Sequence, residues 1–233
     1  MKNILIFRTD RVGDLILTCP AILTIKNYFI NSNITLIASN KNYDYANSLN
    51  FFTNIIKFPN KGFFNKVKFT YKLSKIRFDY IFIFDGKERS YISSLFIKSR
   101  KKVAISSQIK KYYRFYNIKL FEFNEKSKIY DVFQSMLNYF NINSEINNFN
   151  FIRNKTDNNF SNNIPLNNYI HIHLDEKWFK NLYIKSYTDI KPSYESFTEF
   201  LKSASKKNNI VITTGLIDFQ LLTELKQKFF NKK

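Results

Sequence analysis

Short apolar runs alternate with longer segments of helical periodicity along the first part of the chain. Lys2–Phe7 contains an apolar run, a charged loop follows it, and a segment from Asp14 or Leu15 to about Phe29 repeats its apolar positions at helical spacing. The same pattern predicts further strands at Asn33–Ala38, Ile55–Phe58, Asp79–Phe84 and Lys102–Ile105, and further helices up to about Arg77 and over Ile129–Phe140. This alternation indicates βαβ units, so we expect an α/β fold with a Rossmann-type, doubly wound parallel sheet.

An asparagine-rich segment interrupts this pattern. Twelve of the 28 residues from Asn141 to Asn168 are asparagine, which predicts a linker over 146–168 between a domain at 1–145 and another at 169–233. After the linker the pattern predicts strands and helices at Tyr169–Leu174, Tyr194–Lys206, Asn209–Thr213 and Asp218–Phe229. Fewer than 70 residues follow Pro165, whereas a complete α/β domain needs roughly 120, so we expect a partial second Rossmann-like domain.

The charge of the chain is unusual, since Lys and Arg outnumber Asp and Glu by 37 to 18 and give a net charge of +19. Such a field attracts polyanions, anionic membranes or phosphorylated substrates, although a lysine- and asparagine-rich composition would also produce it. The single cysteine, Cys19, excludes a disulfide framework and fits a reducing compartment. The chain shows no long apolar span and no signal peptide, so we expect a cytoplasmic protein.

The loop between the first strand and the first helix carries the strongest chemical signal. It reads Arg-Thr-Asp-Arg-Val-Gly-Asp over residues 8–14. Ligands of parallel sheets bind where strands end and helices begin. Gly13 would allow a tight turn and a close backbone approach. Asp14 could be no more than a helix-start carboxylate, and Asp10 could form a structural ion pair with a neighbouring arginine.

The string ILIFRTDRVGDLILTCPAI resembles the opening of glycosyltransferase family 9, which contains the lipopolysaccharide heptosyltransferases. That family begins with a strand, an R-x-D-x-x-G-D-x-[VIL] loop and a helix with T-x-P-A. The matching residues are Arg8, Asp10, Gly13, Asp14, Thr18, Pro20 and Ala21. The resemblance implies a GT-B-like fold with Asp14 in the place of the catalytic base, which would deprotonate an acceptor sugar hydroxyl. It also implies that Arg8, Asp10, Arg11 and Gly13 shape the loop or bind the acceptor.

A second match follows the strand at Tyr169–Leu174. Family members carry a lysine–tryptophan pair there, so the resemblance implies that Lys177 binds the donor diphosphate and offsets charge on the leaving group. A solvated lysine beside an aromatic residue would look the same. The chain departs from the family where His173 and Leu174 replace small residues and glycine. His171 and His173 share a strand face and could begin a metal site, but no third ligand is spaced to join them, so we interpret them as packed or loop-facing.

The resemblance implies transfer of a sugar, such as heptose, from a nucleotide-diphosphate sugar to a lipopolysaccharide core or related glycan. No metal or other cofactor is expected, and the basic surface would contact the anionic inner membrane peripherally. The family's G-x-T-G…H-x-A donor loop has no counterpart after Thr213–Gly215. A truncated, non-catalytic module that binds a glycan or an anionic surface is therefore the alternative. Nucleic-acid binding would rest on charge alone, so no nucleic-acid partner is expected.

Two further segments admit a structural and a functional interpretation. Asp85–Lys87 follows a predicted strand and could face the ligand cleft or form a plain turn. Lys110–Tyr116 mixes cations with aromatic side chains and could stack on sugars or bases, touch a membrane, or be an ordinary aromatic surface.

Overall fold

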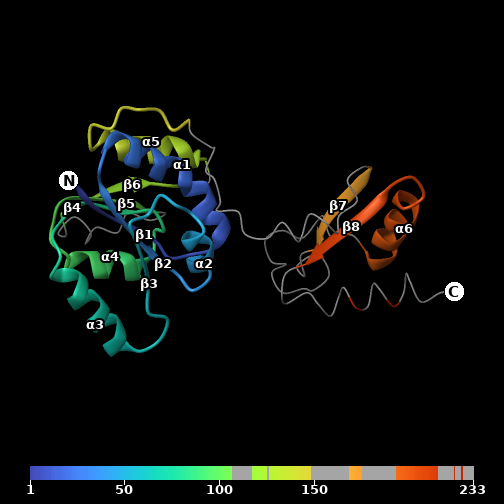
Figure 1. Ribbon diagram of the computed structural model, residues 1–233, viewed down its shortest axis with the longest axis horizontal. Helices are drawn as coiled ribbons and strands as arrows, with labels where there is room; N and C mark the ends of the chain where they lie inside the picture. The colour runs from blue at the N-terminus through green and yellow to red at the C-terminus, as the bar shows by residue number, and fades with distance from the viewer. Residues whose placement is uncertain are drawn as a thin grey trace. The chain divides into compact units, whose positions relative to one another are not determined.

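The computed structural model describes residues 1–106, 117–124, 126–147, 168–174 and 193–214, together with Thr223 and Gln227. The chain divides into two compact units, Met1–Thr156 and Asp157–Lys233. In Figure 1 the first unit runs from blue to yellow and the second from orange to red. Most of the linker predicted at 146–168 lies outside the described residues, so the domain boundaries 1–145 and 169–233 stay a prediction.

The first unit is built on a six-stranded parallel sheet. Its strands are β1 (Asn3–Arg8), β2 (Asn33–Ala38), β3 (Asn54–Lys57), β4 (Phe78–Ile83), β5 (Ser99–Ser106) and β6 (Ile118–Glu122). Its helices are α1 (Val12–Tyr28), α2 (Tyr43–Asn47), α3 (Phe63–Ser74), α4 (Glu88–Leu95) and α5 (Ile129–Asn138). The strand order is β3-β2-β1-β4-β5-β6, which is the Rossmann-type, doubly wound arrangement that the sequence predicts.

Both faces of this sheet are buried, because apolar side chains follow one another without interruption along the central strands. On β1, Ile4 and Ile6 pack in a core that also contains side chains of α1 and α5. Leu5 and Phe7 point the other way, into a core shared with α3 and α4. Figure 1 shows these helix pairs on opposite sides of the sheet. A continuous apolar run is what a strand covered on both faces requires.

The second unit contains two parallel strands and a helix, namely β7 (Tyr169–Leu174), α6 (Tyr194–Ala204) and β8 (Asn209–Thr214). Its core within the described residues is small and consists of Ile172, Leu174, Phe197 and Leu201. The Ser193 side chain accepts a hydrogen bond from the Ser196 N–H and caps α6, as serine commonly does at a helix start. This parallel βαβ unit confirms a second Rossmann-like element, and its partial extent stays a prediction, because residues 175–192 and most of 215–233 lie outside the described residues.

The structure corrects the predicted start of one helix and adds three elements that were not predicted. Helix α1 begins at Val12, two residues earlier than predicted, so Gly13 and Asp14 belong to its first turn. Helices α2 and α4 and strand β6 were not predicted. Helix α4 was not predicted, because its buried side chains include Ser90, Ser93 and Ser94, which leave little apolar periodicity. The helix predicted at Asp218–Phe229 lies outside the described residues, apart from Thr223 and Gln227, which are helical.

No helix in the described part of the chain is a candidate membrane span. None of them combines enough residues with enough apolar character to cross a bilayer.

Candidate active site

The predicted ligand loop lies at the point where the strand order of the sheet reverses. Strands β1 and β4 are neighbours, with Phe7 paired to Ile83 near their carboxyl ends. Residues 8–11 continue from β1 into α1, and Asp85 follows β4. Ligands of doubly wound sheets bind outside the strand ends at this reversal. The motif therefore occupies the position where this fold builds its sites.

Arg8 ends β1 with a buried guanidinium group that joins three elements. Its Nε donates to the Asp14 carbonyl oxygen at 3.0 Å, and its Nη1 donates to the Phe84 carbonyl oxygen beyond β4. The guanidinium group also lies between two carboxylates, 3.3 Å from Asp10 Oδ1 and 3.7 Å from Asp14 Oδ1. Arg8 thus positions the start of α1 and balances the negative charge there.

The Asp10 carboxylate is mostly withdrawn from solvent, since 16% of its side chain is exposed. Its Oδ1 finds no hydrogen-bond donor among the described residues, because the Arg8 Nε–H is directed to the Asp14 carbonyl oxygen. Burial raises the pKa of Asp10 to about 6; the positive charge of Arg8 opposes the rise, while the negative charges of Asp14 and Asp85 add to it. Asp10 therefore takes up its proton near pH 6, well above the pH at which an ordinary aspartate does so.

Asp14 is the more accessible of the two carboxylates, with 41% of its side chain exposed. It occupies the third position of α1, and its Oδ2 accepts the backbone N–H of Arg11 at 3.2 Å. The proposed helix-start role is therefore real. It uses only one carboxylate oxygen, so the exposed group can also meet a ligand.

Gly13 is exposed in the first turn of α1, so the tight turn predicted there is wrong. A Cβ atom at this position would meet nothing within 4 Å. The fold itself therefore does not require glycine at position 13, and the open space beside it remains available for a close approach.

The loop is anchored on the β4 side by Asp85, which is buried. One carboxylate oxygen, Oδ2, accepts the Thr9 N–H at 3.1 Å, the Thr9 hydroxyl at 2.5 Å and the Ser90 hydroxyl at 2.6 Å. The other accepts the Lys87 N–H at 3.1 Å. Arg89 adds bonds from its guanidinium group to the Thr9 hydroxyl and carbonyl oxygens. The segment 85–87 is thus more than a plain turn, because it holds the loop.

Two polar residues after β2 anchor the other side of the loop. The Asn42 amide donates to the Arg8 carbonyl oxygen at 2.8 Å, and the Ser39 hydroxyl donates to the Asp10 carbonyl oxygen at 2.6 Å. Asn42 Oδ1 in turn accepts the Ser39 N–H at 2.8 Å. Because the loop is held from both neighbouring strands, it is organised before any ligand arrives.

Known proteins resemble this chain in fold much more clearly than in sequence. No family model and no curated protein matches the sequence. Among solved structures, the chain is similar to the family 9 glycosyl transferase of Veillonella parvula DSM 2008, with a TM-score of 0.75 and 14% identity over 97% of this chain and 66% of that one. The chain has the GT-B-like fold of glycosyltransferase family 9.

Two heptosyltransferases of this fold are also similar. E. coli heptosyltransferase WaaC, solved with ADP-2-deoxy-2-fluoro heptose, gives a TM-score of 0.62 and 13% identity over 97% of this chain and 74% of that one. E. coli ADP-heptose lps heptosyltransferase II gives a TM-score of 0.64 and 10% identity over 98% of this chain and 69% of that one. The chain spans 66% of the length of the Veillonella protein, and identities this low establish the fold and not the substrate.

The second unit, which the resemblance assigns to the donor, is described only in part. Lys177 lies outside the described residues, as does Lys110–Tyr116, so both interpretations stay predictions. His171 and His173 are exposed, and their ring nitrogens share the Thr213 hydroxyl at 2.9 and 3.0 Å. Within the described residues no cluster of three or more His, Cys, Asp or Glu side chains could hold a metal ion.

Four positioning residues of this site carried little or no signal in the sequence. Ser39, Asn42 and Arg89 were not singled out, and Asp85 was weighed only as a turn or a cleft residue. The available signal was their place, since polar residues directly after buried parallel strands gather at one edge of the sheet.

Proposed function

We propose that this protein is a glycosyltransferase that moves a sugar from a nucleotide-diphosphate sugar to a glycan acceptor, with a lipopolysaccharide core as the acceptor class and heptose as the first donor sugar to test. The neighbour solved with an ADP-heptose analogue supports ADP-sugars as the first donors. The net charge of +19 supports peripheral contact with an anionic membrane. A cytoplasmic location belongs to the same proposal.

The observation that carries this proposal is the different exposure of the two loop carboxylates. The Asp10 side chain is 16% exposed and titrates near pH 6, whereas the Asp14 side chain is 41% exposed and is held in place through Arg8 and the Arg11 N–H. A general base must come within about 3 Å of the hydroxyl that it deprotonates. Of the two, Asp14 is the carboxylate that an acceptor can reach.

In the proposed reaction, Asp14 accepts the proton of the acceptor hydroxyl while that oxygen forms a bond to the anomeric carbon of the donor sugar. The bond from this carbon to the diphosphate oxygen breaks, and the nucleoside diphosphate leaves with the bonding electron pair. Lys177 would offset the charge that grows on the leaving group. Arg11 and Gly13, both exposed beside Asp14, would contact the acceptor.

The test begins with calorimetric titration of the full-length protein with ADP- and UDP-sugars, followed by a transfer assay on Asp14→Asn. Asparagine keeps the shape and the capping ability but loses the basic oxygen, so transfer should fall about 100-fold or more while unfolding changes by no more than about 1 kcal/mol. Asp131→Asn is the matched control, because Asp131 occupies the third position of α5, is exposed, and lines a hollow at the end of β6.

Two outcomes would overturn the proposal. Transfer by Asp14→Asn at the parent rate would leave Asp14 as a helix-start residue only. A parent protein that binds both the nucleotide sugar and the glycan without transferring sugar would support the non-catalytic alternative.

A further inference from the structure

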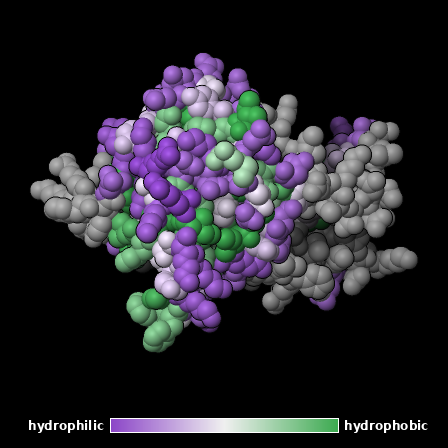
Figure 2. Space-filling model, turned by 60° about the vertical axis from the view of Figure 1, so that its left-hand side comes forward, coloured by the Kyte–Doolittle hydropathy of each residue, from purple (hydrophilic) through white to green (hydrophobic). Residues whose placement is uncertain are grey.

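Helices α3 and α4 border an apolar groove on the surface of the first unit. The groove has a volume of about 620 Å³, the buried Phe58 side chain lines it, and its rim includes Phe63, Val67, Ile92 and Phe96. Phe63 is 75% exposed, and its neighbour Phe64 is 84% exposed. Figure 2 shows green apolar side chains gathered among purple polar ones in the lower part of this unit. Contiguous exposed apolar surface of this kind usually marks an interaction site.

The helix that forms one wall of this groove is surrounded by positive charge. From position 59 to position 77 the chain has five lysines and one arginine and no acidic residue. Lys75 Nζ lies 4.5 Å from the centre of the Tyr71 ring, so aromatic and cationic groups share the same surface. Exposed aromatic side chains beside lysines are typical of helices that lie on anionic membranes.

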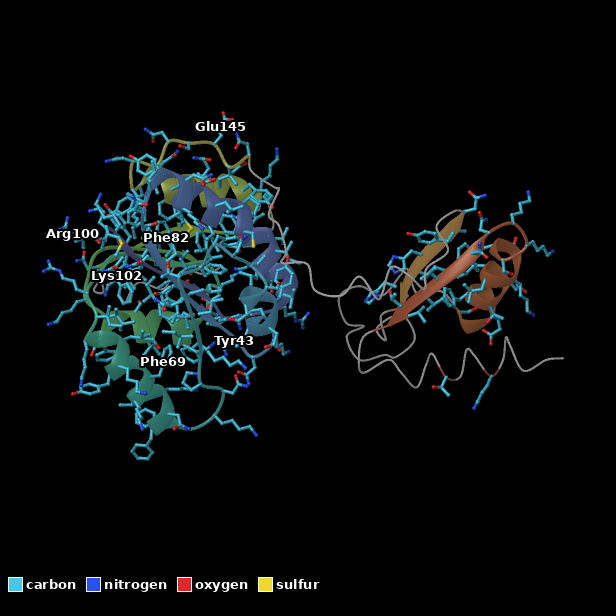
Figure 3. The ribbon with its side chains drawn as sticks, viewed as in Figure 1. Tyr43, Phe69, Phe82, Arg100, Lys102 and Glu145 are labelled. Carbon is cyan, nitrogen blue, oxygen red and sulfur yellow. The ribbon has the colours of Figure 1, made fainter. Side chains whose placement is uncertain are left out.

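A second hollow, of about 600 Å³, adjoins the groove at Ser74 and Phe96, which line both. Five cationic residues line it: Lys75, Arg77, Lys98, Arg100 and Lys102. Figure 3 labels Arg100 and Lys102 on the same side of the unit. Lys102 Nζ donates to the Ser94 carbonyl oxygen at 2.5 Å, and Arg100 forms an ion pair with Asp79 at 3.5 Å. Among the described residues, no carboxylate side chain lines either hollow.

We propose that the apolar groove and the cationic hollow together form a docking surface for an anionic phospholipid bilayer. The groove would take an acyl chain and the hollow would bind the phosphate headgroup, since an anionic phospholipid carries these two groups side by side. A second copy of this chain fits less well, because a net charge of +19 opposes self-association. An acidic peptide would satisfy the lysines but would leave the aromatic groove unused.

The docking surface adjoins the candidate active site. Arg89 lines the groove 5.4 Å from the Phe58 ring, and its guanidinium group donates to Thr9 in the ligand loop. The Phe58 and Arg89 end of the groove therefore lies next to the loop, whereas the cationic hollow lies at the amino ends of β4 and β5. The inference rests on the membrane contact of the proposed function and gives it a surface. Its test requires no sugar donor, so it can fail while sugar transfer still holds.

The first test is flotation of the full-length protein with phosphatidylcholine vesicles that contain 30 to 40% phosphatidylglycerol, compared with pure phosphatidylcholine vesicles. The parent protein should bind the anionic vesicles. Lys75→Gln combined with Lys98→Gln should weaken binding about tenfold or more, because each lysine near an anionic surface contributes roughly fivefold. Lys126→Gln combined with Lys128→Gln removes the same charge beside α5, on the opposite face of the sheet, and should cost much less.

The second test separates the groove from charge alone. Charge by itself predicts complete release in 0.5 M salt, where the Debye length is about 4 Å, whereas an acyl-chain site predicts that part of the binding remains. Phe63→Ser combined with Phe96→Ser should abolish this remainder. Tyr28→Ser combined with Ile30→Ser, exposed at and just beyond the end of α1, should leave it unchanged.

Several results would overturn the proposal: no binding of the parent protein to anionic vesicles, an equal loss in the Lys126 and Lys128 control, or complete release of the parent protein in 0.5 M salt. Binding of polyglutamate without binding of vesicles would assign the surface to an acidic peptide. A dimer in sedimentation velocity that Phe63→Ser with Phe96→Ser dissociates would assign it to a second copy.

Discussion

Two carboxylates four residues apart acquire different properties from their surroundings. Asp10 and Asp14 share the Arg8 guanidinium group, yet only Asp10 is enclosed and left with an oxygen that no described donor reaches. Burial disfavours the charged form of a carboxylate, which explains the raised pKa of Asp10. Residue type alone would not distinguish the two. Their positions distinguish them, because Asp10 lies on the loop and Asp14 lies at the start of the helix.

Asp10 should make the protein less stable as the pH rises from about 4 to about 6. Its folded-state pKa of about 6 lies above the ordinary 3.8, so the folded state binds the proton more tightly than the unfolded state. The stabilising effect is complete below pH 3.8 and is lost as the pH rises through 6. Two pH units correspond to about 3 kcal/mol. The measurement is urea unfolding of the parent protein and Asp10→Asn between pH 4 and pH 7, where their difference should change by up to this amount.

Asp79 supplies the control for this experiment. Burial raises its pKa, but the Asn3 N–H and the charges of Lys2 and Arg100 outweigh that effect, so its pKa is lowered overall. Its stabilising effect is present above pH 3.8 and is lost only as the pH falls further. The difference between the parent protein and Asp79→Asn should therefore stay flat from pH 7 to pH 4. A flat Asp10 difference over the same range would contradict the raised pKa of Asp10.

At the scale of elements, the start of α1 is fixed by groups that come from β2 and β4. Asp85 receives hydrogen bonds from Thr9, Lys87 and Ser90, and Ser39 and Asn42 bind backbone carbonyl oxygens of the loop. Hydrogen bonds to a charged group each contribute about 1.5 to 3 kcal/mol. The loop is thus held rigidly at the edge of the sheet, as a site that positions reacting groups requires.

Gly13 and Gly86 have contrasting backbone conformations, so their substitution by alanine should change stability in opposite directions. Gly13 is helical and has open space beside it, so Gly13→Ala should leave stability unchanged or raise it by up to about 1 kcal/mol. Gly86 has a φ of +58°, so Gly86→Ala should cost about 1 to 2 kcal/mol. Thermal unfolding measures both. If an acceptor approaches the backbone at Gly13, Gly13→Ala should also raise the KM for the acceptor.

The stability and the acceptor KM of the Gly13→Ala protein separate an effect on folding from an effect on binding. A Gly13→Ala protein with lower stability would show that the open space is not available. An unchanged KM for the acceptor would remove Gly13 from the proposed acceptor contacts and leave the role of Asp14 standing.

At the scale of the whole molecule, a net charge of +19 should make stability depend on salt. Self-repulsion destabilises a compact, highly charged state, and salt screens it. The Debye length falls from about 30 Å at 0.01 M to about 8 Å at 0.15 M, so Tm should rise by several degrees over this range. Sodium chloride and sodium sulfate at equal ionic strength should act alike if screening is the cause. A larger rise with sulfate would indicate anion binding, and a constant Tm would contradict the self-repulsion.

The sequence by itself determined the class of fold and predicted the position of the candidate ligand loop. Strands β2 and β7 were predicted with their observed bounds. The apolar run of β2 lies where both strand faces are covered, whereas β7 alternates, with Ile172 and Leu174 buried and His171 and His173 exposed. The loop at residues 8–14 was identified in the same way, because residues that end a parallel strand and begin a helix must lie at the ligand edge of the sheet. These are local patterns, and one stretch of chain contains all the information that they need.

Only the tertiary structure decided which side chains meet. The burial of Asp10, the anchoring of the loop by Asp85 and Asn42, and the groove between α3 and α4 each depend on residues that are more than 20 positions apart in sequence. The short helix α4 forms because its serines and Tyr91 pack against the sheet and against neighbouring polar groups, which no periodicity of its own could show. The burial and the electrostatic environment of a side chain therefore depend on neighbours that are distant in sequence. The sequence therefore predicted a candidate site, and the fold determined the exposure, the electrostatic environment and the hydrogen-bond partners of its residues.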